Sequence, residues 1–287
     1  MTLTPQELVS GSIDLVSLPD VCVRVQAMTE DPDSTAAGLG KVISQDIALT
    51  ASLLKLVNSA YYGFPVKIDT VSRAVSIVGI RELRDMSLAM SAVEVFSSIP
   101  NNLIDMASFW RHSVFCGLVA QALSEHCSIL HKERLFIAGL LHDIGKLLIY
   151  CRLPEEACEI LKRIETVPVD ICLEEQRVLG FDHAQVGAEL LALWQLPEGL
   201  QEIIACHHSP ELANKAKLEA AIVHIANEIT HFIEQAEECD PSPYYDPYAV
   251  FSDAEKLVGE YKENQFTQVK PIAWEVTGIT IKHVMLS

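Results

Sequence analysis

Apolar residues recur at helical spacing along almost the whole chain, and this pattern limits the fold more than any other feature of the sequence. It is clearest in three segments: DIALTASLLKLVNSA (46–60), SVFCGLVAQALSEH (113–126) and AIVHIANEITHFI (221–233). Residues at positions i, i+3, i+4 and i+7 share one face of a helix, so each segment can bury one face in a core. No convincing run of alternating apolar and polar residues occurs before the last twenty residues. The pattern predicts an all-α fold.

Length and charge narrow the possibilities further. The chain has 287 residues, of which 49% are hydrophobic and 7% aromatic, and this composition suits a sizeable aliphatic core. Its 21 basic and 39 acidic side chains give a net charge of −18. Because an acidic surface repels the phosphate backbone, we do not expect direct binding to nucleic acid.

The N-terminus and the cysteines indicate the compartment. The segment MTLTPQELVS has neither the basic region nor the apolar core of a signal peptide, and no apolar run is long enough to cross a bilayer. The eight Cys residues form no C-x-x-C pair, and several lie inside apolar helical patterns. We interpret them as reduced core residues. The sequence therefore predicts a cytoplasmic protein without membrane contact, and it leaves the oligomeric state open.

A boundary is predicted at the segment IPNN (99–102). Acidic side chains outnumber basic ones far more strongly after this segment than before it, and Pro and Asn break the helical pattern. The predicted parts are an N-terminal helical subdomain (1–100), a helical subdomain with the candidate site (101–240), and a C-terminal helix and tail (241–287). The β-branched tail from Phe266 onward is assigned no role.

Potential metal ligands are concentrated after the boundary. They are His112 in FWRHS, His142 and Asp143 in LLHDIGK, His183 in GFDHAQVGAEL, and His207 and His208 in IIACHHSPE. Imidazoles with a carboxylate suit a divalent transition metal such as Fe, Mn, Zn or Ni. Their spacing is too long for a zinc finger and fits a site inside a helical bundle. The alternative is that these residues are hydrogen-bonded members of the core or of an interface, as we expect for His126, His131, His231 and His283.

Several longer motifs resemble those of the HDOD-domain proteins of bacterial signalling. In the first half these motifs are SLPDV (17–21), SQDIALTASLLKLVNSAYYG (44–63) and SRAVSIVGIRELRDMSL (72–88). In the second half they are FWRHS, GLLHDIGKL, FDHAQVGAELLALWQLP and HHSPE. The likeness covers about residues 12–235. It implies the HDOD fold, an HD-like helical bundle with an N-terminal helical subdomain.

The resemblance also implies roles for individual residues. The HDOD family is related to the HD phosphohydrolases, including the HD-GYP cyclic-dinucleotide phosphodiesterases, in which a His-Asp doublet and further His residues hold metals that activate water. By this resemblance the first ligand would be His112, the doublet His142 and Asp143, with Asp143 between two ions, and the outer ligands His183, His207 and His208. Lys146 would be a catalytic residue near a substrate phosphate.

Three departures from the enzyme pattern affect the functional prediction. The late Asp ligand is replaced by Asn227, a weaker ligand, and the Glu one turn before the first His is replaced by Ser108. The Gly-Tyr-Pro loop is absent after His208. The resemblance thus predicts a regulatory protein with one or two metal ions and weak or no hydrolysis, whose partner is a signalling protein or a small phosphorylated ligand. The alternatives are a metal-dependent phosphohydrolase that acts on a nucleotide or phosphate ester, and a scaffold without a metal.

Overall fold

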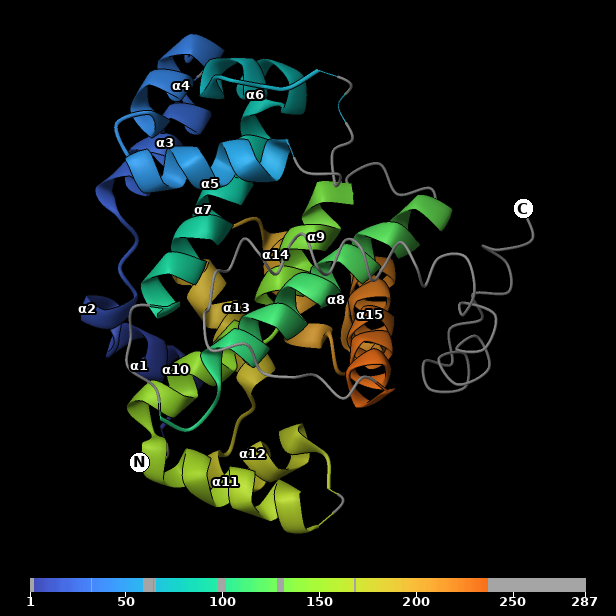
Figure 1. The fold of residues 1–287 in the computed structure, drawn as a ribbon. Coiled ribbons are helices and arrows are strands. Elements are labelled where there is room, and N and C mark those ends of the chain that lie inside the picture. The colour runs from blue at the N-terminus through green and yellow to red at the C-terminus, as the bar shows by residue number, and fades with distance from the viewer. Residues whose placement is uncertain are drawn as a thin grey trace.

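The computed structural model describes residues 3–31, 33–58, 64, 66–97, 102–127, 132–167 and 169–236. Within these ranges the chain forms fifteen α-helices, one 3₁₀ helix and no strand, so the all-α prediction is confirmed (Figure 1). None of the described helices combines the length and the apolar character that crossing a bilayer requires. Most of the predicted boundary segment IPNN, the predicted C-terminal helix and the tail lie outside the described residues.

Seven helices precede the predicted boundary. They are α1 (Pro5–Ser10), α2 (Ile13–Val16), α3 (Asp20–Glu30), α4 (Ala36–Ile43), α5 (Ile47–Val57), α6 (Val71–Val78) and α7 (Ile80–Ser97). Four of them begin where a Thr or Asp side chain accepts a hydrogen bond from a backbone N–H of the first turn; these residues are Thr4, Thr35, Asp46 and Thr70. Such caps satisfy N–H groups that have no partner inside the helix, so they fix where each helix starts.

The remaining helices include those that form the candidate site. They are α8 (Met106–His126), α9 (Lys132–Leu141), α10 (Ile144–Arg152), α11 (Pro154–Thr166), α12 (Ile171–Leu179), α13 (His183–Leu193), α14 (Glu198–Cys206), η1 (Pro210–Leu212) and α15 (Lys217–Ala236). Helix α8 packs against both α9 and α15, and α13 packs against both α10 and α14 (Figure 1). The site lies where these six helices meet.

The first helices of the chain contact the second part of the chain. Helix α1 packs on α13. The indole N–H of Trp194 donates to the carbonyl of Val16 at 2.9 Å, and the Trp194 ring makes an edge contact with Phe96 at 6.4 Å between centroids. Arg152 Nε donates to Ser12 Oγ at 2.8 Å. Buried apolar side chains from both parts form one cluster, and the division at residue 100 stays a prediction.

Gly145, the glycine of LLHDIGK, lies at a close approach of α10 and α13. A Cβ atom at this position would collide with the carbonyl oxygen of His183 and stand 2.7 Å from the amide nitrogen of Gly187. Because these neighbours are backbone atoms, they cannot rotate away. The absence of a side chain at residue 145 therefore lets α10 begin beside the start of α13, and this contact brings Asp143 within reach of His183.

We predict that Gly145→Ala destabilises the fold by about 1–3 kcal/mol or more, because the added methyl group forces the two helices apart. The measurement is the free energy of unfolding from urea titration. Gly199→Ala is the matched control, since a Cβ there meets only the far end of the Arg134 side chain at 3.4 Å. The control is expected to be neutral or slightly stabilising. An unfolding free energy of Gly145→Ala equal to that of the original chain would contradict the close approach.

Candidate metal centre

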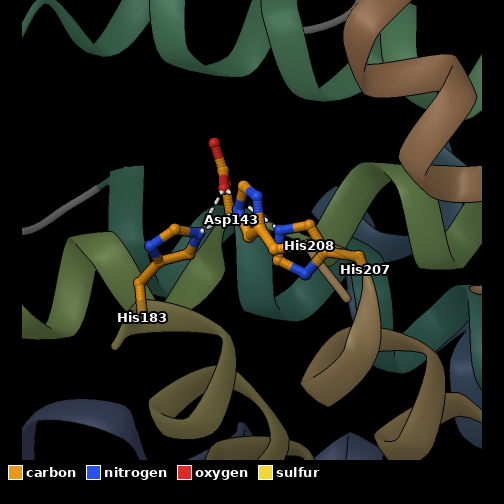
Figure 2. Close-up of side chains that lie close together, drawn as sticks. All are labelled: Asp143, His183, His207 and His208. Atoms are coloured by element: carbon orange, nitrogen blue, oxygen red, sulfur yellow. Dashed lines mark hydrogen bonds and ion pairs between the residues drawn. The ribbon is translucent and has the colours of Figure 1, made fainter. Parts of the chain in front are cut away.

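Helix ends carry most of the candidate ligands into one place. His142 and Asp143 form the two-residue junction between α9 and α10, and His183 is the first residue of α13. His207 and His208 follow the last residue of α14. Since a helix begins or ends at each of these positions, ligands from several helices can point to one centre (Figure 2).

Asp143, His183, His207 and His208 form what we call the inner cluster. Each offers one ligand atom, and these four atoms all lie within 4.8 Å of one another. Asp143 Oδ1 lies 3.1 Å from His183 Nε2 and 3.8 Å from His207 Nε2, and the Nε2 atoms of His183 and His208 are 3.0 Å apart (Figure 2). Three imidazoles and a carboxylate at these separations match the donor set that divalent transition metals prefer.

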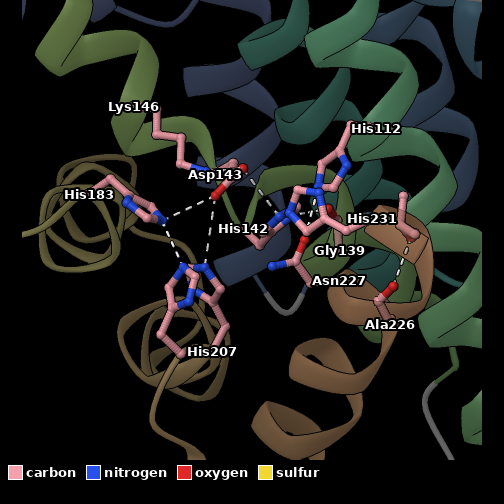
Figure 3. Close-up of polar contacts among 12 residues, drawn as sticks. His112, Gly139, His142, Asp143, Lys146, His183, His207, Ala226, Asn227 and His231 are labelled. Atoms are coloured by element: carbon pink, nitrogen blue, oxygen red, sulfur yellow. Dashed lines mark hydrogen bonds and ion pairs between the residues drawn. The ribbon is translucent and has the colours of Figure 1, made fainter. Parts of the chain in front are cut away.

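His112, His142 and Asp143 form an adjoining second cluster, whose ligand atoms also lie within 4.8 Å of one another. His142 Nε2 is 3.4 Å from Asp143 Oδ2. Asn227 faces this cluster, because its Oδ1 lies 2.9 Å from His112 Nε2 (Figure 3). Asp143 belongs to both clusters and lies between them. The structure thus brings all seven predicted ligands into one region.

Backbone carbonyls set the orientation of two imidazoles. His142 Nδ1 lies 2.7 Å from the Gly139 carbonyl, and His207 Nδ1 lies 2.7 Å from the Ile204 carbonyl. A carbonyl can only accept, so each Nδ1 donates and each Nε2 keeps a free lone pair. These Nε2 atoms are buried and have no hydrogen-bond partner among the described residues, and Asp143 Oδ1 faces the ring nitrogen His183 Nε2 at 3.1 Å. Buried lone pairs that converge in this way fit a cation between them.

The carboxylate of Glu175 sets the orientation of the third imidazole, that of His183. Its Oε2 accepts a hydrogen bond from the His183 backbone N–H at 2.8 Å and lies 2.7 Å from Nδ1 of the same residue. Both side chains are fully buried. Burial alone would lower the pKa of His183, but the carboxylates of Glu175 and Asp143 raise it to about 9. A proton on His183 Nε2 and a metal ion are therefore alternative positive partners for Asp143 Oδ1.

The protonation states of the neighbours favour metal binding. Burial lowers the pKa of His142 and His207, and it lowers that of His208 to about 2, so these rings are neutral at pH 7. Burial would raise the pKa of Asp143, but its interactions with His142 and with the Lys146 ammonium outweigh burial and hold that pKa well below its usual value. A neutral imidazole and an ionised carboxylate are the forms that bind metals.

Lys146, the predicted catalytic residue, forms an ion pair with the shared carboxylate. Its Nζ donates to Asp143 Oδ2 at 2.6 Å (Figure 3). Burial opposes the charge on Lys146, but the carboxylate of Asp143 outweighs it and raises the pKa of Lys146. The side chain is only 13% exposed. The ammonium of Lys146 thus points into the site and neutralises Oδ2 of Asp143.

Four residues of this region were not predicted as part of the site: Glu175, His224, His231 and Glu234. Glu175 had a signal in the sequence, because it shares the apolar face of α12 with Cys172 and Leu179, at spacings of three and four residues. His224 Nδ1 donates to the His207 carbonyl at 2.8 Å.

His231, expected in a core or an interface, leaves 49% of its side chain exposed. The side chains of His126, His131 and His283 lie outside the described residues. Ser108 is exposed and donates to Asp105 at 2.6 Å.

Comparison with known proteins places the chain among its relatives. The sequence model of the HDOD-domain family matches residues 15–210 of this chain. An uncharacterized protein of Treponema pallidum (strain Nichols) is 28% identical over 228 residues, which are 77% of this chain and 43% of the relative. The chain thus spans less than half the length of this relative.

Two solved structures show the same fold. An HDOD domain protein with unknown function from Geobacter sulfurreducens has a TM-score of 0.67 and 22% identity, and the match covers 95% of this chain and 98% of the other. A protein of Shewanella amazonensis SB2B named "Putative phosphohydrolase" has a TM-score of 0.68 and 24% identity, with 88% and 95% covered. At these identities the structures support the fold alone, whereas the domain match covers more than half of the chain. The chain therefore belongs to the HDOD-domain family.

Proposed function

We propose that the chain is a regulatory HDOD protein of bacterial signal transduction that holds one divalent transition-metal ion in the inner cluster. One observation carries the proposal. The Nε2 atom of His207 is buried without a hydrogen-bond partner among the described residues, and it converges with the buried carboxylate of Asp143 and with His183 and His208. Leaving such groups without a positive partner costs free energy, which a bound ion would offset. The donors suit Fe, Mn, Zn or Ni.

A second ion is disfavoured by charge. The second cluster offers His112, His142 and the shared Asp143, with the neutral amide of Asn227 beside them. Asp143 Oδ2 already accepts from the Lys146 ammonium. A further cation next to that ammonium would meet repulsion with little carboxylate charge to balance it. This balance supports one tightly held ion rather than two.

The same features support regulation over turnover. Lys146 contacts Asp143, so its ammonium is already committed inside the site. The segment that follows His208 forms the short helix η1 in place of a Gly-Tyr-Pro loop. We propose that the metal stabilises the fold in the cytoplasm while a signalling protein or a small phosphorylated ligand binds. A net charge of −18 disfavours a polyanionic ligand without a local basic pocket.

The alternative function is a metal-dependent phosphohydrolase that acts on a nucleotide or phosphate ester. It is favoured by the position of Lys146 beside the inner cluster and by the name of one protein with the same fold. A bound divalent ion would supply Lewis-acid activation of water and of a phosphoryl oxygen. Lys146 would then leave Asp143 and bind the phosphate group.

The direct test of the proposed function is metal content. We expect protein purified without added metal or chelator to contain Fe, Mn, Zn or Ni at fewer than two ions per chain, measured by elemental analysis. Chelation should lower the free energy of unfolding by about 3–4 kcal/mol when the free ion is otherwise in large excess, because only the folded chain binds it.

Asp143→Asn is the control for the metal test. It keeps the shape of the side chain and removes the charge, so chelator should not change its melting temperature. The proposal fails if the original chain contains no metal and binds none on titration, or if its melting temperature is the same with and without chelator.

We predict that Asn227→Asp raises the affinity for a second ion by about 10–100-fold, because a carboxylate supplies the charge that the second cluster lacks. The measurement is isothermal titration with Mn²⁺. Asn214→Asp, which adds the same charge at an exposed position, is the control. Equal affinities of Asn227→Asp and the original chain would mean that Asn227 does not face the second cluster in solution.

We also predict no appreciable hydrolysis of cyclic di-GMP, since the loop that shapes the phosphodiesterase pocket is absent and the chain is strongly acidic. The measurement is product formation with added Mn²⁺ or Fe²⁺. Turnover at ordinary enzyme rates that His142→Ala abolishes would favour the phosphohydrolase instead.

A further inference from the structure

Helix α15 carries a row of four side chains of metal-binding type: His224, Asn227, His231 and Glu234. Their spacing of three, four and three residues places them on one face of the helix. His224 and Asn227 are buried, with 8% and 3% exposed, whereas the side chains of His231 and Glu234 are 49% and 27% exposed. The row therefore leads from the metal centre to the surface along the helix that packs on α8.

We propose that the outer end of this row, with His112, is a separate, solvent-facing metal site. The outer cluster consists of His112, His231 and Glu234, whose ligand atoms lie within 4.8 Å of one another. Glu234 Oε2 is 2.9 Å from His112 Nδ1 and 3.9 Å from His231 Nδ1, and the two rings are 4.5 Å apart between centroids. Two bonds of about 2.0–2.1 Å at a tetrahedral angle separate their ligand atoms by about 3.3 Å, so small rotations suffice.

The surroundings of His112 support this site independently. Each ring nitrogen of His112 lies 2.9 Å from an oxygen atom. Nε2 faces Oδ1 of Asn227, and Nδ1 faces Oε2 of Glu234. A neutral imidazole donates through one nitrogen only, and a carboxylate only accepts. If Nε2–H donates to Asn227, the lone pair of Nδ1 faces Glu234, and a cation between them satisfies both. Ligand imidazoles commonly donate their other N–H to an oxygen in this way.

Asn227 thereby gains a role other than that of a weak ligand. In this tautomer its amide oxygen accepts from His112 Nε2, and the free Nδ1 faces the partly exposed Glu234. The outer cluster shares no residue with the inner cluster, so this proposal does not rest on the proposed function. Two imidazoles and one carboxylate suit Zn²⁺ or a similar nitrogen-preferring ion. Water would complete the coordination because His231 and Glu234 are exposed, and this ion should exchange readily.

The test is isothermal titration of Zn²⁺ into the metal-depleted full chain. We expect a strong event from the inner cluster and a weaker event from the outer cluster. His231→Gln and Glu234→Gln should each weaken the second event by at least about 10-fold and leave the first unchanged. Glu228→Gln, which removes an exposed carboxylate from the same helix, is the matched control and should change neither event.

A variant of the inner cluster separates the two proposals. His208→Gln should weaken the strong event and keep the weaker one. A chain that lacks the strong event but keeps a weaker one sensitive to His231→Gln would overturn the proposed function and support the outer cluster. The outer cluster is overturned if the original chain shows no weaker event, or if His231→Gln and Glu234→Gln give the isotherm of the original chain. Thermal melting of each variant checks that the fold is kept.

Discussion

The carboxylate of Asp143 is ionised and almost fully buried, so it must be compensated by positive charge and hydrogen bonds. An uncompensated charge at this depth would cost several kcal/mol. The two oxygens meet this requirement differently. One accepts from Lys146, only three residues later, and the other faces His183 and His207 from α13 and the end of α14. The packing of α10 on α13, and of α13 on α14, brings these partners to the two oxygens.

The two sides of Asp143 are unequal. On the inner side, Glu175 adds a second buried carboxylate behind His183, so negative charge is available to balance a cation. On the other side, Asn227 contributes no negative charge, and the ammonium of Lys146 already neutralises the near oxygen of Asp143. Little negative charge is left there to balance a cation. Similar ligand types can therefore surround two neighbouring positions and still bind ions with very different strength, because the total charge differs more than the number of ligands.

The sequence predicted much of this arrangement. The spacing of apolar residues predicted the helices, and the resemblance to HDOD proteins predicted the set of ligands that the structure brings together. The sequence did not reveal Glu175 or Glu234 as partners of the imidazoles. Glu234 meets His112 across 122 residues of sequence, and such a pairing depends on how α15 lies against α8 rather than on any local pattern. Lys146 lies only three residues after Asp143, so the sequence could suggest that the two side chains pair. How strongly this ion pair compensates the carboxylate depends on the burial of Asp143, which the sequence does not show.

Helix α13 connects the candidate metal centre to the start of the chain. It begins at His183, continues for 11 residues, about 16 Å, and is followed by Trp194, which binds the Val16 carbonyl and contacts Phe96. A straight helix of this length moves as a rod. If His183 shifts along the helix axis when an ion binds to the candidate site, Trp194 should shift by a similar distance, and the N-terminal helices that contact this tryptophan should move with it.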